Sequence, residues 1–195
     1  MPSYPTPAGM RATSGAPLPL TKLTAYIRGR AAATVIDAIW VPVVSALLIV
    51  LAGAMGFWME QPWLFAGLGP TVLMIVSNPG HETTSVRAVV VGHLAAIACA
   101  FLAVLMLNAT EAPTVMAADG ALSPRVLASA AAIAMLALVQ PQLRAYHPPA
   151  AATALLITLG AYRMTGKTPL ALMCGVVVVV VGAELLRRVR PRSRR

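Results

Sequence analysis

Charged residues are scarce in this chain of 195 residues: only 11% are Asp, Glu, Lys or Arg, whereas 58% are hydrophobic. A soluble domain of this length could not bury so much apolar surface. Acidic residues are the rarer charged class, with 6 against 15 basic ones, so the formal net charge is +9. Most of the basic excess lies in the terminal tails, which suits an anionic membrane surface, and we therefore expect no nucleic-acid partner.

Groups that carry catalysis are also few. Cys99 and Cys174 are the only cysteines, and both lie in apolar segments, so no disulfide framework is predicted. An intramembrane enzyme would need a pair of carboxylates, a set of metal ligands or an activated nucleophile at suitable spacing, and none of these patterns is found. We therefore expect no enzymatic activity, no cofactor and no metal site.

Long uncharged runs are what the sequence does contain. A helix needs about 20 apolar residues to cross a bilayer, so the chain is predicted to be an all-α polytopic membrane protein. About six helical segments are expected, including the valine run at 176–181, because backbone groups in lipid must bond internally. The second and fifth are short and interrupted by Gly and Pro, so four full spans are the alternative. The expected segments are 38–58, 63–77, 88–107, 126–143, 148–162 and 170–186.

The basic residues predict the orientation of these segments. Residues 1–36 are expected to form a cytoplasmic tail with an amphipathic interfacial helix at 19–33. Residues 37–186 form the transmembrane domain, and residues 187–195 form a basic cytoplasmic tail. Both termini are then cytoplasmic, because twelve of the fifteen Lys and Arg residues lie inside. We expect a multi-pass protein of the bacterial inner membrane.

The two halves of the chain show weak internal similarity. A shift of 82 residues places TVLMI at 71–75 over TALLI at 153–157. Three segments per half would reverse the orientation of the second half and give a 3+3 inverted repeat. Interrupted segments at matching positions of such halves indicate a transporter's binding site near the midplane. A chance match of two alanine-rich apolar stretches is the alternative.

The first candidate site motif is the stretch GLGPT, which contains Gly69, Pro70 and Thr71. Proline favours the first turn of a helix, so a helix is expected to begin at Pro70 inside the membrane. Its first amide groups would lack partners and could bind an anion, with the Thr71 hydroxyl as a further donor. The alternative is a proline kink that only packs against neighbouring helices.

The second motif is His147-Pro148-Pro149, followed by three alanines and Thr153. The prolines predict a second helix start, and the alanines would let a ligand approach its backbone closely. The His147 imidazole could donate a hydrogen bond to an anion or take up a proton. A histidine that caps the fourth helix at the interface is the alternative.

The third motif places Arg87 before the third segment and His93 within it, next to Gly92. Arg87 is expected at the cytoplasmic boundary, where positive-inside anchoring explains it. An ionisable side chain such as His93 is costly inside a bilayer and is therefore a functional candidate. A hydrogen bond between packed helices is the alternative for His93.

Together the strings HPPAAATALL, GPTVLMIVSNP and R-x4-GH resemble the HPP family of small integral membrane proteins. The resemblance covers roughly residues 37–186. It implies a protein usually described as four-spanning, in a family whose plastid and cyanobacterial members are associated with nitrite transport. Val86 and Ala151 depart from the family's usual proline and glycine at these positions, which leaves the substrate open. The motif residues carried over are Gly69, Pro70, Thr71, Arg87, Gly92, His93, His147, Pro148, Pro149 and Thr153.

These observations favour a membrane transporter or channel for a small inorganic anion such as nitrite. The expected partners are that anion and the lipid bilayer, and a homo-oligomer is compatible with the sequence. The alternative is a non-transporting membrane anchor or sensory module. The substrate, the direction of transport and proton coupling stay open at this level.

Overall fold

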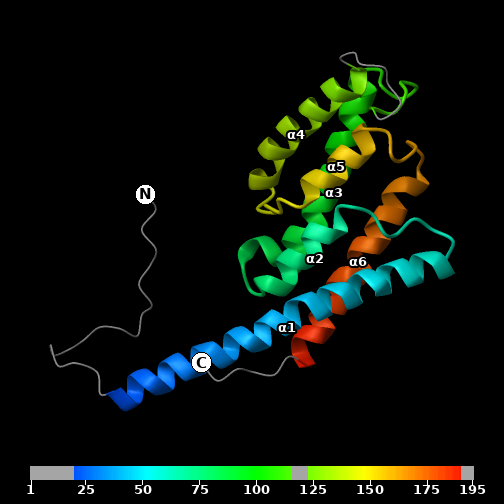
Figure 1. Ribbon diagram of the computed structural model, residues 1–195. Coiled ribbons are helices and arrows are strands. Elements are labelled where there is room, and N and C mark those ends of the chain that lie inside the picture. The colour runs from blue at the N-terminus through cyan, green and yellow to red at the C-terminus, as the bar shows by residue number, and fades with distance from the viewer. Residues whose placement is uncertain (1–19, 116–122, 190–195) are drawn as a thin grey trace. The chain divides into compact units, whose positions relative to one another are not determined.

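The computed structural model describes residues 20–115 and 123–189, and the environments of side chains from residue 38 onward. Residues 1–19 of the expected N-terminal tail (1–36) and residues 190–195 of the expected C-terminal tail (187–195) lie outside the described residues. The described chain is entirely helical and contains no strand, which confirms the predicted all-α class (Figure 1). Its elements are α1 (Leu20–Trp58), α2 (Leu68–Ser77), η1 (Glu82–Thr84), α3 (Val86–Met106), α4 (Pro124–Gln142), α5 (Ala150–Thr158) and α6 (Lys167–Val189).

Four of these helices are long and apolar enough to cross a membrane, namely part of α1 (Ala38–Trp58) and the whole of α3, α4 and α6. The helices α2 and α5 have 10 and 9 residues. At about 1.5 Å per residue, each is about half as long as the roughly 30 Å hydrocarbon core is thick. The second and fifth segments are therefore short, as predicted, and neither helix can span a bilayer alone.

The first helix differs from the sequence prediction. A short interfacial helix and a separate first span were expected, but α1 continues from Leu20 to Trp58 without a break. Pro42 lies inside it and does not end it. Proline lacks only one donor, and a continuous helix satisfies the remaining backbone groups within the segment. An interfacial position for its first half stays a prediction.

The helix order repeats in the two halves as long, short, long. The short helices begin at Leu68 and Ala150, which are 82 positions apart, and the long helices after them begin at Val86 and Lys167. Contacts repeat as well: α3 contacts α5, α2 contacts α6, and α3 and α6 contact each other. These contacts agree with halves that exchange by a two-fold axis, whereas the packing of α4 against α3 and α5 has no counterpart of similar extent at α1 among the described residues. The superposition of residues 37–108 on 119–190 about an axis in the membrane plane stays a prediction.

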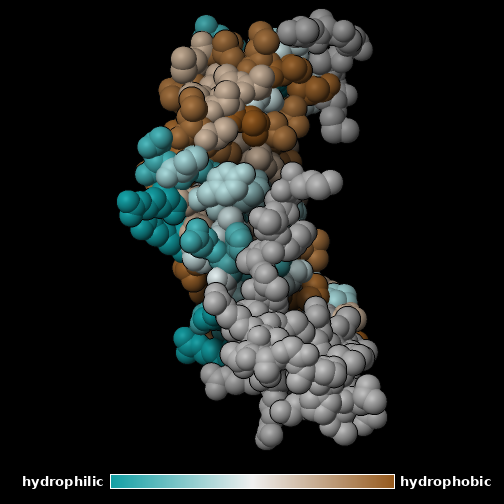
Figure 2. Space-filling view, turned by 90° about the vertical axis from the view of Figure 1, so that its left-hand side faces the viewer, coloured by the Kyte–Doolittle hydropathy of each residue, from teal (hydrophilic) through white to brown (hydrophobic). Residues whose placement is uncertain are grey.

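Helix α3 is the centre of the packing, because it contacts α4, α5, α6 and η1 (Figure 1). Small side chains let neighbouring helices approach its backbone closely. Figure 2 shows large apolar areas on one face of the molecule, interrupted by hydrophilic side chains. Exposed leucines and valines on several helices suit contact with lipid. Small buried residues of α3 are Ala88, Gly92, Ala95, Ala96, Ala100 and Ala103, and exposed apolar residues include Val50, Leu105, Leu138 and Leu170.

A buried arginine fixes the end of α5. The Arg125 side chain is only 7% exposed, and its guanidinium donates to backbone carbonyls of the segment after α3 and of the last turn of α5. Gly160 lies against it with a φ of +87°, and a Cβ there would lie 2.8 Å from Cζ of Arg125. Arg125 therefore joins three segments of the chain. The accepting oxygens belong to Thr110, Ala112, Pro113 and Thr158.

Arg125→Lys is expected to destabilise the protein by at least the value of one hydrogen bond to a charged group, about 1.5–3 kcal/mol. Lysine keeps the charge but lacks the planar fork that reaches several carbonyls at once. Thermal unfolding of the purified protein in detergent measures the effect, with the exposed Arg163→Lys as the control. Equal unfolding temperatures for both variants would contradict the structural role of Arg125.

Candidate functional site

Four predicted side chains from three parts of the chain converge on one buried cluster: Thr71 of α2, His93 of α3, Thr153 of α5 and His147 just before α5. Each is 0% exposed. The Thr71 hydroxyl lies 3.0 Å from Nε2 of His93 and 3.2 Å from Nε2 of His147. The Nδ1 atom of His93 lies 2.8 Å from the Thr153 hydroxyl. We call these four residues the His/Thr cluster.

The backbone holds both ends of this cluster. The Thr71 hydroxyl also donates to the carbonyl of Gly67, at 2.9 Å. On the other side, Nδ1 of His147 lies 2.8 Å from the carbonyl of Thr83 in η1. The Gln140 side chain of α4 accepts from the His147 amide and donates to its carbonyl. The imidazole and the backbone of His147 are therefore both fixed.

Two glycines make room for the cluster. A Cβ at Gly67 would lie 2.7 Å from the Thr153 hydroxyl, and a Cβ at Gly92 would lie 2.8 Å from Cβ of His147. Both distances are shorter than ordinary van der Waals contacts, so neither position accepts a larger residue without movement. The Phe65 ring packs edge-on against His93, with centroids 6.2 Å apart.

The expectation that the first amides of the two short helices lack hydrogen-bond partners is wrong. The first amides of α2, Leu68 and Gly69, donate to carbonyls of the preceding turn. At the start of α5, the amides of residues 150–152 donate to the carbonyls of residues 147–149. Tight turns before both helices thus satisfy the groups that were expected to be free. Side-chain groups, rather than helix amides, are the polar feature of this site.

The other predicted residues lie around the cluster rather than in it. Gly69 is half-buried with open space at its Cα, and Pro70 and Pro148 are exposed. Helix α2 begins at Leu68, before Pro70, whereas Pro149 is buried and precedes the first residue of α5. Arg87 is exposed and donates to the carbonyl of Leu143, so it ties the start of α3 to the end of α4.

The sequence interpretation missed four residues that contact or support the cluster. Gln140 was a polar side chain within an apolar segment, and this signal could have identified it. Gly67 is the first residue of the stretch GLGPT, so its place in that motif could also have identified it. Nothing in the sequence pointed to the Thr83 carbonyl or to the Phe65 ring, because neither is a polar side chain in a helical segment.

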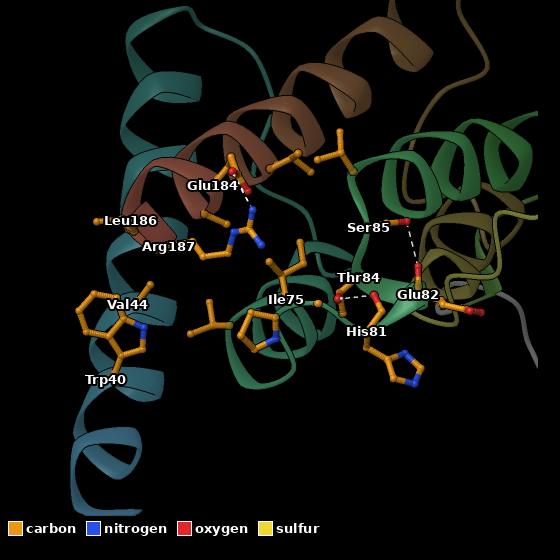
Figure 3. A pocket seen from close by; sticks show the side chains of 16 residues that line it. Trp40, Val44, Ile75, His81, Glu82, Thr84, Ser85, Glu184, Leu186 and Arg187 are labelled. Carbon is orange, nitrogen blue, oxygen red and sulfur yellow. Dashed lines mark hydrogen bonds and ion pairs between the residues drawn. The ribbon is translucent and has the colours of Figure 1, made fainter. Parts of the chain in front are cut away.

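A cavity of about 330 Å³ lies next to the cluster, on the other side of η1. Figure 3 shows residues of α1, of α6 and of the turn between α2 and α3 around it. Glu82 and Thr84 line the cavity, whereas Thr83 between them is buried and its carbonyl contacts His147. One helical turn therefore separates the cavity from the His/Thr cluster. The cavity also contains Trp40, Ile75 and the ion pair between Glu184 and Arg187 (Figure 3).

The cluster contains two hydroxyls, which donate hydrogen bonds, and two imidazoles, which donate hydrogen bonds and can also take up a proton. A carbonyl only accepts, so the contact with Thr83 assigns the proton of neutral His147 to Nδ1. In the described residues, no three His, Cys, Asp or Glu side chains come together. The cluster thus offers a metal two imidazoles at most, but it offers an anion two hydroxyls and two rings.

Comparison with known proteins gives one match. A family model described as "HPP, transmembrane region" matches residues 30–195, which is most of the chain. No curated protein matches, and no solved structure matches.

Proposed function

The chain belongs to the HPP family of membrane proteins, and from that premise we propose that it is a transporter or channel for a small inorganic anion, with nitrite as the first candidate. Its membrane-embedded character follows from the family and from the four apolar helices. The identity of the anion, the transport activity and the absence of enzymatic activity of this protein are parts of the proposal.

The observation that carries the proposal is the buried His/Thr cluster. A protein core seldom buries four polar side chains from separate elements when apolar residues could fill the same space, since unpaired polar groups are costly there. Two imidazoles and two hydroxyls can replace the water around a small anion. In the described residues, no carboxylate contacts the four side chains to repel an anion.

The short helices suit such a role. Discontinuous helices near the membrane centre, in matching positions of two halves, are typical of substrate sites in transporters. Thr71 and Thr153 stand 82 positions apart, in the two short helices, and both contact His93. The four side chains bond to one another in this structure, so an anion binds by replacing these bonds. None of the four side chains lines the cavity beyond η1, so an anion from this cavity has to pass the turn at Glu82–Thr84.

Uptake into proteoliposomes tests the proposed function. Nitrite, nitrate, formate, chloride and bicarbonate are offered separately, and vesicles without protein measure passive leak. We expect saturable uptake of nitrite and weaker uptake of the larger or more strongly hydrated anions. Uptake of every anion at the rate of empty vesicles would refute the proposal.

A non-transporting anchor or sensory module is the second candidate. The observation in its favour is that the four side chains contact one another and two backbone carbonyls, as an interhelical packing device would. In that case, variants of the cluster would change stability and leave anion uptake at the level of empty vesicles. The uptake experiment therefore separates the two functions.

For the orientation, we propose that both termini are cytoplasmic in the bacterial inner membrane. The reason is the excess of Lys and Arg that this arrangement places inside. Reporters fused at Arg195 and at Ala117 are expected to report opposite sides. Signals from the same side at both positions would contradict this orientation.

A further inference from the structure

The hydrogen-bond contacts of the His/Thr cluster require more protons than the neutral side chains carry. Two hydroxyls and two neutral imidazoles supply one hydrogen each, four in total. Five contacts need one: Thr71 with Gly67, with His93 and with His147, then His93 with Thr153, and His147 with Thr83. One contact therefore lacks a hydrogen in the neutral cluster.

The position of the missing proton follows from the partners. Two carbonyls accept only, so the single hydroxyl hydrogen of Thr71 and the Nδ1 hydrogen of His147 are directed to them. The ring of His93 can donate from Nε2 to Thr71 and accept at Nδ1 from Thr153. The contact left over joins Nε2 of His147 to Thr71. This nitrogen is therefore the atom of the cluster that faces a hydroxyl oxygen without a hydrogen between them, and at which the cluster can take up a proton.

The cluster can carry only one such proton, because a second positive charge would be repelled by the first. The rings of His93 and His147 have centroids 5.3 Å apart, and two positive charges at that distance in a buried site repel strongly. Other ionisable groups lie farther out on the elements that surround the cluster. They are His81 just before η1, Glu82 in η1, Arg87 on α3, and Arg144 and Tyr146 in the link to α5, while Gln140 of α4 is neutral.

A buried imidazolium without a counter-ion is costly, and so is a buried anion without a cation. The free-energy cost of burying each charge is smaller when the proton and the anion enter the cluster together. We propose that the cluster binds one proton, on Nε2 of His147, with each anion, so that transport moves an electroneutral pair. This inference rests on the anion transport proposed above.

Histidine NMR and calorimetry test it on the full-length protein in lipid nanodiscs, with sodium nitrite as the probe. The chain has three histidines, so ring-¹⁵N labelling gives few signals, and His81→Gln assigns one of them by its loss. Near pH 7 we expect nitrite to move the Nε2 signal of His147 from an unprotonated to a protonated ring nitrogen. Titration in two buffers of different ionisation heat is expected to show about one proton taken up per nitrite bound.

Two variants separate this inference from the proposed function. His147→Gln is expected to bind nitrite more weakly, with proton uptake close to zero, whereas the exposed Thr165→Val keeps about one proton per anion. Nitrite binding by the unmodified protein without proton uptake overturns the inference and leaves the proposed function standing. Full proton uptake by His147→Gln also overturns it. If the unmodified protein binds no nitrite, the proposed function fails and the inference fails with it.

Discussion

Thr71→Val is expected to weaken anion uptake by roughly ten- to a hundredfold in apparent affinity. Thr71 connects the His/Thr cluster, because its hydroxyl contacts both imidazoles and the Gly67 carbonyl. Valine keeps the shape of threonine and removes only the hydroxyl. The expected loss equals that of one hydrogen bond to a charge, about 1.5–3 kcal/mol. The concentration dependence of nitrite uptake into proteoliposomes measures it.

Three further variants make this result specific. Thr71→Ser restores the hydroxyl and is expected to recover most of the affinity. Thr153→Val removes one contact with His93 and is expected to have a smaller effect than Thr71→Val. Thr165→Val changes an exposed threonine and should leave uptake unchanged. If Thr71→Val transports every anion of the panel as the unmodified protein does, the cluster is a packing device and the anion binds elsewhere.

The helices were predictable because their signal is local. Apolar runs gave the four long helices, and interruption by Gly and Pro marked α2 and α5 as short. The convergence of Thr71, His93, His147 and Thr153 could also be anticipated, since a polar side chain inside lipid needs a partner and few others were present. Their role in binding an anion stays a prediction.

The features of the site that the sequence could not predict depend on the conformation of the backbone between the helices. The carbonyl of Thr83 reaches His147 only because η1 turns that peptide inward, and a threonine in a loop gives no sign of this. The amides at the starts of α2 and α5 were expected to be free. Whether they are free depends on the turn before each helix, where proline fixes φ but does not decide which carbonyl lies within reach.

Gly92→Ala is expected to disrupt the site with a single methyl group. A Cβ at residue 92 would lie 2.8 Å from Cβ of His147 and 3.2 Å from the Ala145 carbonyl. These atoms belong to a fixed segment rather than to a flexible side-chain end, so residues 145–147 must move away from α3. That movement breaks the contacts of His147 with Thr83 and Thr71. We expect a loss of about 1–3 kcal/mol in stability and at least tenfold weaker nitrite uptake.

Gly182→Ala is the matched control for Gly92→Ala. Gly182 is also buried in a long helix, and a Cβ there would lie 2.7 Å from Cδ2 of Leu48, which is the end of a side chain and not part of a backbone segment. Thermal unfolding and nitrite uptake are measured for both variants in parallel. The two should differ in uptake even where their stabilities are similar, because only residue 92 contacts the segment that carries His147. Normal uptake by Gly92→Ala would show that the position of His147 against α3 does not matter for transport.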